Sequence, residues 1–199
     1  MSQSQSLPEK ESQSPEICTL KDKFGRSLPC YIEHYFEAEA KKYVVLLPVD
    51  LPVELFAWRE SGDEEELVTI DNEAPEIDEI FPLAKAVLEE QNLTLNRTAL
   101  TLTASGELPD IAEDEPPEEY QQLGELREED DYEELQWLAT FYKEEQEYSI
   151  YAPLDPLFIV ARQNKEGEAE LLSAEEESAL EPMLPSLEEI IENQIFDEI

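Results

Sequence analysis

The apolar and polar positions of the chain alternate in short runs, which is typical of β-strands. The stretch 17–20 meets a turn around Gly25, and an apolar run returns at 27–36, so we predict a β-hairpin that begins at Ile17. Gly25 supplies the positive φ angle that a short turn requires. Polar turns and prolines separate the next candidate strands, at 42–49, 55–59 and 66–70.

A helical pattern follows these strands. Between Ile77 and Leu88, apolar residues recur three and four positions apart, as on the buried face of an amphipathic helix. Pro82 interrupts this pattern because it lacks a backbone N–H and clashes with the preceding turn. We therefore expect a helix that is either kinked at Pro82 or begins there.

The second half of the chain repeats the order of the first. Residues 43–50 and 148–155 share the pattern Tyr-x-x-x-x-Pro-x-Asp at a constant offset of 105 residues. Further segments match in the same order: 101–109 with 19–29, 158–162 with 55–59 after a two-residue deletion, 171–172 with 67–68, and 187–192 with 83–90. A duplicated unit explains this order, and chance similarity among short strand-like runs is the alternative.

We predict an α+β fold of two repeated small antiparallel β units, each closed by a C-terminal helix. The N-terminus is expected to be disordered, and an acidic linker is expected within the second unit. The predicted division is 1–16 for the lead-in, 17–96 for the first β-rich unit with its helix, 97–109 for the start of the second unit, 110–134 for the acidic linker or loop, and 135–199 for the remainder of the second unit with its helix.

Acidic residues dominate the composition. Asp and Glu number 51 against 13 Lys and Arg, which gives a net charge of -38. Nucleic acids and anionic membranes attract proteins through basic surfaces, so we expect no direct nucleic-acid binding. So large a charge opposes compaction, but Leu, Ile, Val and Phe form about a quarter of the chain, above the roughly one-fifth typical of disordered chains. We therefore expect folded segments separated by acidic, solvated ones.

The sequence has no evident membrane span or targeting segment. Its apolar run at 43–47 ends at Pro48, which is far short of the roughly 18 residues of a spanning helix. The first 16 residues have no basic stretch followed by an apolar one, and two cysteines do not make a disulfide framework. We expect a cytoplasmic protein with no membrane insertion.

Residue types that usually carry catalysis are scarce. His34 is the only histidine, and no phosphate-binding loop or metalloprotease motif occurs. Two cysteines and one histidine leave a structural zinc site one ligand short. Acidic pairs are so frequent that they identify no site. We therefore predict a protein that is not an enzyme, with no catalytic residue, no metal and no cofactor.

Cys18 and Cys30 are the candidate redox site. Their midpoint is residue 24, the centre of the predicted turn, so they are expected to face each other across the hairpin. Two interpretations remain open. The residues form a redox disulfide, or they are two small apolar thiols in a strand pair.

Aromatic residues in the predicted strands are the other candidates for a site. Most are expected in the core, but a small sheet covered by one helix has a second face that can bind a partner. The candidate partner surface consists of Trp58, Trp137 and Tyr142, together with Asp130 and Asp131 of the acidic linker.

Several of these features resemble known families. Asp-x-x-Gly at 22–25, the segment 43–50, aromatic-Ala-x-Arg at 56–59 and Leu-Val-x-Ile-Asp at 67–71 precede an acidic helix. This order resembles a small acidic bacterial domain of unknown function (family 1292). The two-unit, very acidic form is similar to a cyanobacterial and chloroplast family of unknown function (family 3727). The resemblance implies a fold and a photosynthetic lineage, and it carries over no catalytic residue.

The leading hypothesis is a non-enzymatic interaction or assembly factor that binds a basic protein partner through its acidic surface. One alternative is a nucleic-acid mimic that regulates a DNA- or RNA-binding protein. The other is a minor redox role through Cys18 and Cys30. The oligomeric state and the packing of the two units remain open from the sequence.

Overall fold

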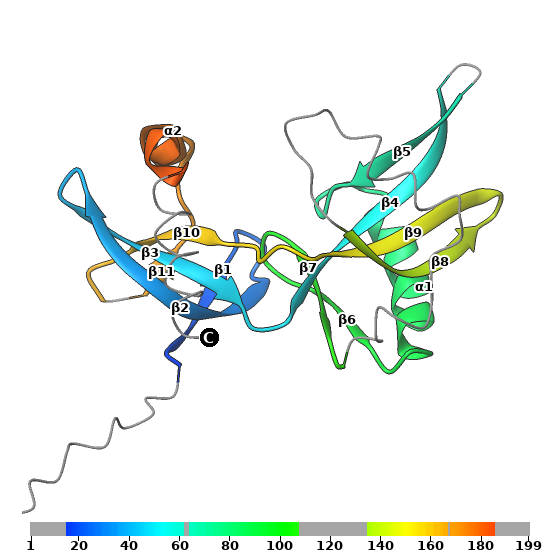
Figure 1. Ribbon diagram of the computed structural model, residues 1–199, viewed down its shortest axis with the longest axis horizontal. Coiled ribbons are helices and arrows are strands. Elements are labelled where there is room, and N and C mark those ends of the chain that lie inside the picture. The colour runs from blue at the N-terminus through cyan, green and yellow to red at the C-terminus, as the bar shows by residue number, and fades with distance from the viewer. Residues whose placement is uncertain (1–14, 62–63, 108–134, 167, 186–199) are drawn as a thin grey trace, which may run out of the picture.

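The computed structural model describes residues 15–61, 64–107, 135–166 and 168–185. This part of the chain forms antiparallel sheets with two short α-helices, arranged as two lobes side by side (Figure 1). The predicted α+β class is therefore confirmed. Residues 1–14 of the predicted lead-in, the predicted linker 110–134 and the predicted helix at 187–192 lie outside the described residues.

Lobe 1 is built on a five-stranded antiparallel sheet, here called sheet 1. Its strands, in spatial order, are β1 (Ile17–Lys21), β2 (Ser27–Ala38), β3 (Lys41–Pro48), β10 (Ile159–Gln163) and β11 (Ala169–Glu170). The predicted first hairpin is confirmed: β1 pairs with β2, and Gly25 in the turn has a φ of 82°.

Lobe 2 is built on a six-stranded sheet, here called sheet 2. Its path is β6 (Thr94–Arg97), β7 (Leu102–Ser105), β4 (Leu51–Ser61), β9 (Gln146–Pro153) and β8 (Leu135–Lys143), and β5 (Glu64–Ile70) also pairs with β4. The alternation of apolar residues does not predict β6, and the predicted boundary between residues 96 and 97 falls inside this strand.

Each sheet contains strands from both halves of the sequence. β3 pairs with β10 in sheet 1, and β4 pairs with β9 in sheet 2. The chain therefore passes between the lobes after β3 and again after β9. Both strands end at a proline, Pro48 and Pro153, which has no N–H to donate to a neighbouring strand. The two predicted sequence units do not each form a separate sheet.

The two cross-half pairings have the same register. In lobe 1, Tyr43 is opposite Arg162, and in lobe 2, Tyr148 is opposite Ala57. Both residues of one pair are 105 positions from their counterparts in the other. The predicted match of 158–162 with 55–59 is therefore wrong by two residues, because the strands pair without the assumed deletion.

Helix α1 (Ile77–Glu89) covers one face of sheet 2. Its buried residues, Ile77, Ile80, Ala84 and Leu88, follow the predicted spacing and pack on apolar residues of β4, β8 and β9. Pro82 lies inside the helix, so the expectation that the helix begins there is wrong.

Helix α2 (Ala174–Leu180) lies against sheet 1 and leads into the short 3-10 helix η2 (Glu181–Met183) (Figure 1). Ser173 and Glu176 form a capping box, in which each side chain accepts a backbone N–H of the other residue. The opposite face of sheet 1 forms its own apolar core, into which the β6–β7 connection of lobe 2 inserts Ala99. This insertion ties the two lobes together.

Candidate functional site

The two tryptophans of the predicted partner surface lie together. Trp58 on β4 and Trp137 on β8 are half-buried beside the buried ring pair of Phe56 and Tyr151, on the face of sheet 2 that is opposite α1. The rings of Phe56 and Tyr151 meet edge to face, with centroids 5.4 Å apart. The Trp137 indole donates a hydrogen bond to the Thr140 hydroxyl.

Tyr142 lies further along β8, and the register shift between Trp137 and Ala139 adds one residue, so that alternation places Tyr142 on the same face as Trp137. Its side chain is exposed, and its hydroxyl donates a hydrogen bond to Glu147. The structure thus brings the three predicted aromatic residues to one face of one sheet. Asp130 and Asp131 lie outside the described residues.

Cys18 and Cys30 are directly opposite each other on β1 and β2, as predicted. Both are free thiols, with Cys30 buried and Cys18 half-buried. Burial raises the pKa of Cys30 to about 12 and also raises the pKa of Cys18. Because the thiolate is the reactive form, both residues have the character of packed thiols at neutral pH. Whether they form a redox pair stays a prediction.

His34 is half-buried on β2, next to a register shift in the pairing with β3. Within the described ranges, no group of three or more His, Cys, Asp and Glu residues is placed to hold a metal ion. No helix in that part of the chain has the length and apolar character needed to cross a membrane.

The carboxyl group of Glu176 in lobe 1 has a strongly lowered pKa. Its side chain is 6% exposed, and it accepts hydrogen bonds from Lys41 Nζ at 2.9 Å, from the Ser173 N–H at 3.1 Å and from Arg162 Nη1 at 3.2 Å. The hydrogen bond from Lys41 contributes most to lowering the pKa of Glu176 to about 2, and the Ser173 N–H and Arg162 lower it further. This group was not predicted from the sequence, although Ser-x-x-Glu before a helix is a recognisable signal.

Lobe 2 also has a glutamate at the start of its helix: Glu76 lies directly before α1, whereas Glu176 is the third residue of α2. Its carboxylate pairs with Arg59 and accepts a 2.6 Å hydrogen bond from the Tyr148 hydroxyl. Burial, together with this bond, raises the pKa of Tyr148 to about 12. In each lobe, a glutamate at the start of the helix thus binds an arginine of the sheet.

A stacked aromatic pair accompanies each of these glutamates. Phe36 stacks on Tyr43 in lobe 1, with centroids 5.3 Å apart, and Phe141 stacks on Tyr148 in lobe 2, at 5.2 Å. Both residues of one pair are again offset by 105 positions from those of the other. Each pair joins the two strands of a hairpin, β2–β3 in lobe 1 and β8–β9 in lobe 2, because its two residues are opposite each other.

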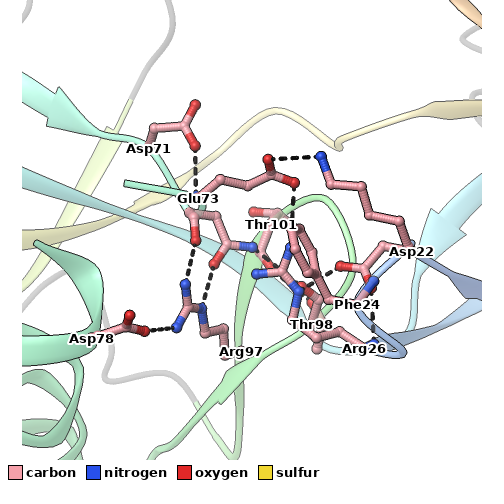
Figure 2. Close-up of polar contacts among 11 residues, drawn as sticks. Asp22, Phe24, Arg26, Asp71, Glu73, Asp78, Arg97, Thr98 and Thr101 are labelled. Carbon is pink, nitrogen blue, oxygen red and sulfur yellow. Dashed lines mark hydrogen bonds and ion pairs between the residues drawn. The ribbon is translucent and has the colours of Figure 1, made fainter. Parts of the chain in front are cut away.

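A polar network joins the lobes at the β1–β2 turn (Figure 2). The Asp22 carboxylate accepts the N–H groups of Phe24 and Arg26, and Glu73 of lobe 2 pairs with Lys23 and Arg26 at 3.4 and 3.6 Å. The Arg26 guanidinium also lies over the Phe24 ring. The turn that contains the Asp-x-x-Gly pattern therefore contacts lobe 2 through its charged side chains.

Arg97 forms the lobe 2 side of the same network. It pairs with Asp78 of α1 (Figure 2). It also donates a 2.8 Å hydrogen bond to the carbonyl of Asn72. The Asn72 amide in turn donates to the Thr98 carbonyl. The loops that face lobe 1 are therefore fixed by side chains, which is a structural role for these charges.

Described residues of the sheets line surface cavities, of which two concern the candidate site and the repeated motif. One, of about 660 Å³, lies between sheet 1 and α2, and apolar residues dominate its lining. The other, of about 460 Å³, lies where the chain passes between the lobes, and it brings together both Pro-x-Asp segments, with Pro48 and Asp50 beside Pro153 and Asp155. The repeated motif therefore meets at one place in the structure.

These features define a β-rich α+β protein in which each of two sheets contains strands from both halves of the chain. The family model described as "Protein of unknown function (DUF3727)" matches residues 92–198, which is more than half of the chain, and the chain belongs to this family. A second model, "Protein of unknown function (DUF1292)", matches residues 24–89. Both predicted resemblances are thus confirmed. No curated protein and no solved structure matches the chain significantly.

The two family matches meet between α1 and β6. The sheets are not divided there, because each one takes strands from both sides of this point. The segment that matches the second model contains β2 to α1, yet β3 and β4 within it belong to different lobes.

Proposed function

We propose that this protein is a non-enzymatic interaction or assembly factor that binds a basic protein partner through its acidic surface. The observation that carries this proposal is the distribution of charge. Many of the 13 bases are already neutralised within the chain, since these residues all pair with carboxylates: Lys23, Arg26, Lys41, Arg59, Arg97, Lys143 and Arg162. The remaining excess of acidic charge is therefore available to attract a basic partner.

An uncompensated acidic surface attracts cationic proteins over distances comparable to the Debye length, which speeds encounter and makes the complex salt-sensitive. The exposed positions of both helices add to this potential, because α1 and α2 each have acidic residues in the first turn and no base in the last turn. The family resemblance makes basic proteins of a cyanobacterial or plastid-related lineage the natural candidates.

We also propose that the two lobes descend from one duplicated unit, each copy closed by its helix, whose second halves have been exchanged. Three features support this: the shared pairing register, the two stacked Phe–Tyr pairs, and the glutamate at the start of each helix. Exchange of equal elements between copies needs no new contact type, since the interfaces pre-exist in the single unit.

Affinity capture from the source organism tests the proposed function. Captures at about 50 mM and about 500 mM salt should recover basic proteins at low salt and lose most of them at high salt, because the Debye length falls about threefold. Recovery of the same proteins in equal amounts would contradict an electrostatic partner. Competition between nucleic acid and the protein for one captured partner would instead favour the mimic.

One observation favours the redox alternative, namely that Cys18 and Cys30 are opposite each other on paired strands. The raised pKa of both thiols opposes it. A thiol titration of the folded protein distinguishes the two, because a redox pair must react without unfolding.

A further inference from the structure

In the part of the chain that the structure describes, the two helices cover their sheets unequally. α1 has 13 residues and buries four apolar side chains, whereas α2 has seven residues and buries Leu180 as its apolar contact. Beside α2, sheet 1 retains the cavity of about 660 Å³, whose apolar floor includes Val45, Phe158, Val160, Leu172 and Leu184. This volume is in the range of roughly 300–1,000 Å³ in which ligand-binding pockets fall. We call this cavity the α2 groove.

The rim of the α2 groove is acidic. Glu177 on α2 and Glu181 on η2 line the groove and are exposed, and Glu175 is exposed on the same helix. Among the described residues that line the groove, none is a Lys or Arg. Leu100, which is 48% exposed, extends the apolar floor toward lobe 2. An apolar floor with an acidic rim is complementary to a ligand with one apolar and one basic face.

We propose that the α2 groove binds the apolar face of a basic amphipathic helical segment from the partner protein. Apolar residues of that segment at spacings of three and four fit the floor, and its lysines or arginines face Glu177 and Glu181. This inference rests on the proposed function and gives it a binding site. The groove is on the opposite lobe from Trp58 and Trp137, so it is separate from the aromatic face.

Charge decides between this occupant and two others. Residues 186–199 follow the groove residue Leu184 closely and contain apolar residues, but they also contain five carboxylate side chains and no base. A second copy of the chain would bring another net charge of -38. Both occupants would place acids against the acidic rim, which is unfavourable at moderate salt.

Fluorescence anisotropy with the full chain tests the proposal. The probe is a labelled peptide of leucine and lysine whose leucines are three and four residues apart, and its control is a scrambled peptide of equal composition. The amphipathic peptide should bind at least about tenfold more tightly, which corresponds to about 1.4 kcal/mol. Equal charge on the two peptides separates groove binding from general attraction.

Paired variants locate the binding site. Glu177→Lys with Glu181→Lys should weaken binding about tenfold, whereas the control Glu89→Lys with Glu90→Lys, on the exposed end of α1, should change it less than about threefold. Leu100→Ser should weaken binding, and Leu83→Ser, a leucine of similar exposure on α1, should not. Unchanged thermal unfolding of each variant confirms that the fold is retained.

Each other outcome has a definite meaning. Equal affinity for both peptides, with no effect of the groove variants, would overturn the groove and leave the proposed function intact. Failure of both peptides to bind at low salt would overturn the proposed function as well. If the double variant Leu187→Glu and Ile191→Glu bound the amphipathic peptide about tenfold more tightly than the wild type, the chain's own C-terminal segment would be the occupant of the groove. That result would also overturn the proposal.

Discussion

The two lobes have one strand arrangement and two different coverings. The order β2, β3, β10, β11 in sheet 1 corresponds to β8, β9, β4, β5 in sheet 2, with a stacked Phe–Tyr pair at the same place. In lobe 2, the 13-residue α1 buries four apolar residues, whereas in lobe 1 the seven-residue α2 leaves a groove. Within the described residues, the sheets have the same strand arrangement, and the shorter helix leaves an apolar groove in lobe 1.

The lobes also differ in how the helix is attached. Glu176 in lobe 1 is nearly buried and binds two cationic side chains, Lys41 and Arg162. Glu76 in lobe 2 is more exposed and binds Arg59 and the Tyr148 hydroxyl. Lobe 1 therefore relies on a charged contact where lobe 2 relies mainly on apolar burial.

The largest expected effect follows from this difference in burial. Leu88→Ala on α1 should lower the free energy of unfolding by about 3–4 kcal/mol, because Leu88 is fully buried. Leu180→Ala on α2 should cost about 2 kcal/mol, because Leu180 borders the groove and the site collapses or admits water. Urea denaturation of both variants measures the difference, with the exposed Leu83→Ala as the control. Equal losses for Leu88 and Leu180 would remove the basis of the comparison.

The next largest effect on stability is expected at the glutamates at the start of the two helices, Glu176 and Glu76. Glu176→Gln should lower the free energy of unfolding at neutral pH by about 1–3 kcal/mol, since it breaks charged hydrogen bonds at a nearly buried site. Glu76→Gln should cost about 1 kcal/mol or less, because its partner Arg59 is exposed to solvent. Chemical denaturation at pH 7 compares the two.

The pH dependence of this effect has a definite sign. The folded pKa of Glu176, about 2, lies below its ordinary value of 4.5, so its stabilisation is complete above about pH 4.5 and is lost as the pH falls toward 2. The gap in stability between the wild type and Glu176→Gln should therefore shrink between pH 5 and pH 2.5. A gap that stays constant over this interval would contradict the assignment of the low pKa to Glu176.

Much of the local structure could be predicted from the sequence, but its assembly could not. Alternating apolar residues and the turn at Gly25 identify the first hairpin and the facing pair Cys18 and Cys30, and spacings of three and four identify α1. Strand β6 was not predicted, because it has four residues without a clear alternation of apolar and polar positions. The pairing of strands from different halves of the chain could not be predicted, because β3 could pair with β4 or with β10 on apolar pattern alone, and only long-range packing decides.

The candidate site was predicted in part for the same reason. Trp58 and Trp137 are far apart in sequence, so their meeting depends on the pairing of β4 with β9 and of β9 with β8. The α2 groove depends on how short α2 is relative to sheet 1, which no sequence spacing specifies. Glu176 was detectable as a capping box, but its ion pair with Lys41 spans 135 positions.

The stacked pairs test whether the lobes are equivalent. Phe36→Leu and Phe141→Leu should each lower stability by about 1 kcal/mol, because each removes a ring stack and retains most of the apolar contact. Thermal unfolding measures both losses, and the double variant should be additive because the pairs are in different lobes. Losses that differ by more than about 2 kcal/mol would argue against a shared unit.

The smallest effect concerns the thiols, which occur in lobe 1 alone. At pH 8, alkylation of Cys18 should be slower than that of an exposed thiol, and Cys30 should react more slowly still, because burial raises the pKa of both. Mass spectrometry after timed iodoacetamide treatment separates the two sites, and denatured protein is the reference. Rapid formation of a Cys18–Cys30 disulfide in the folded protein under mild oxidation would favour the redox alternative.

The central claim is that the two lobes share a scaffold and that the less covered one binds the partner. Amide chemical shifts of the full chain, recorded by NMR as the basic amphipathic peptide is added at about 150 mM salt, test it most directly. The account predicts shift changes concentrated at Val45, Leu100, Val160, Leu172 and Leu180 around the α2 groove, with little change along α1. Changes of equal size along α1, or changes spread evenly over both lobes, would contradict it.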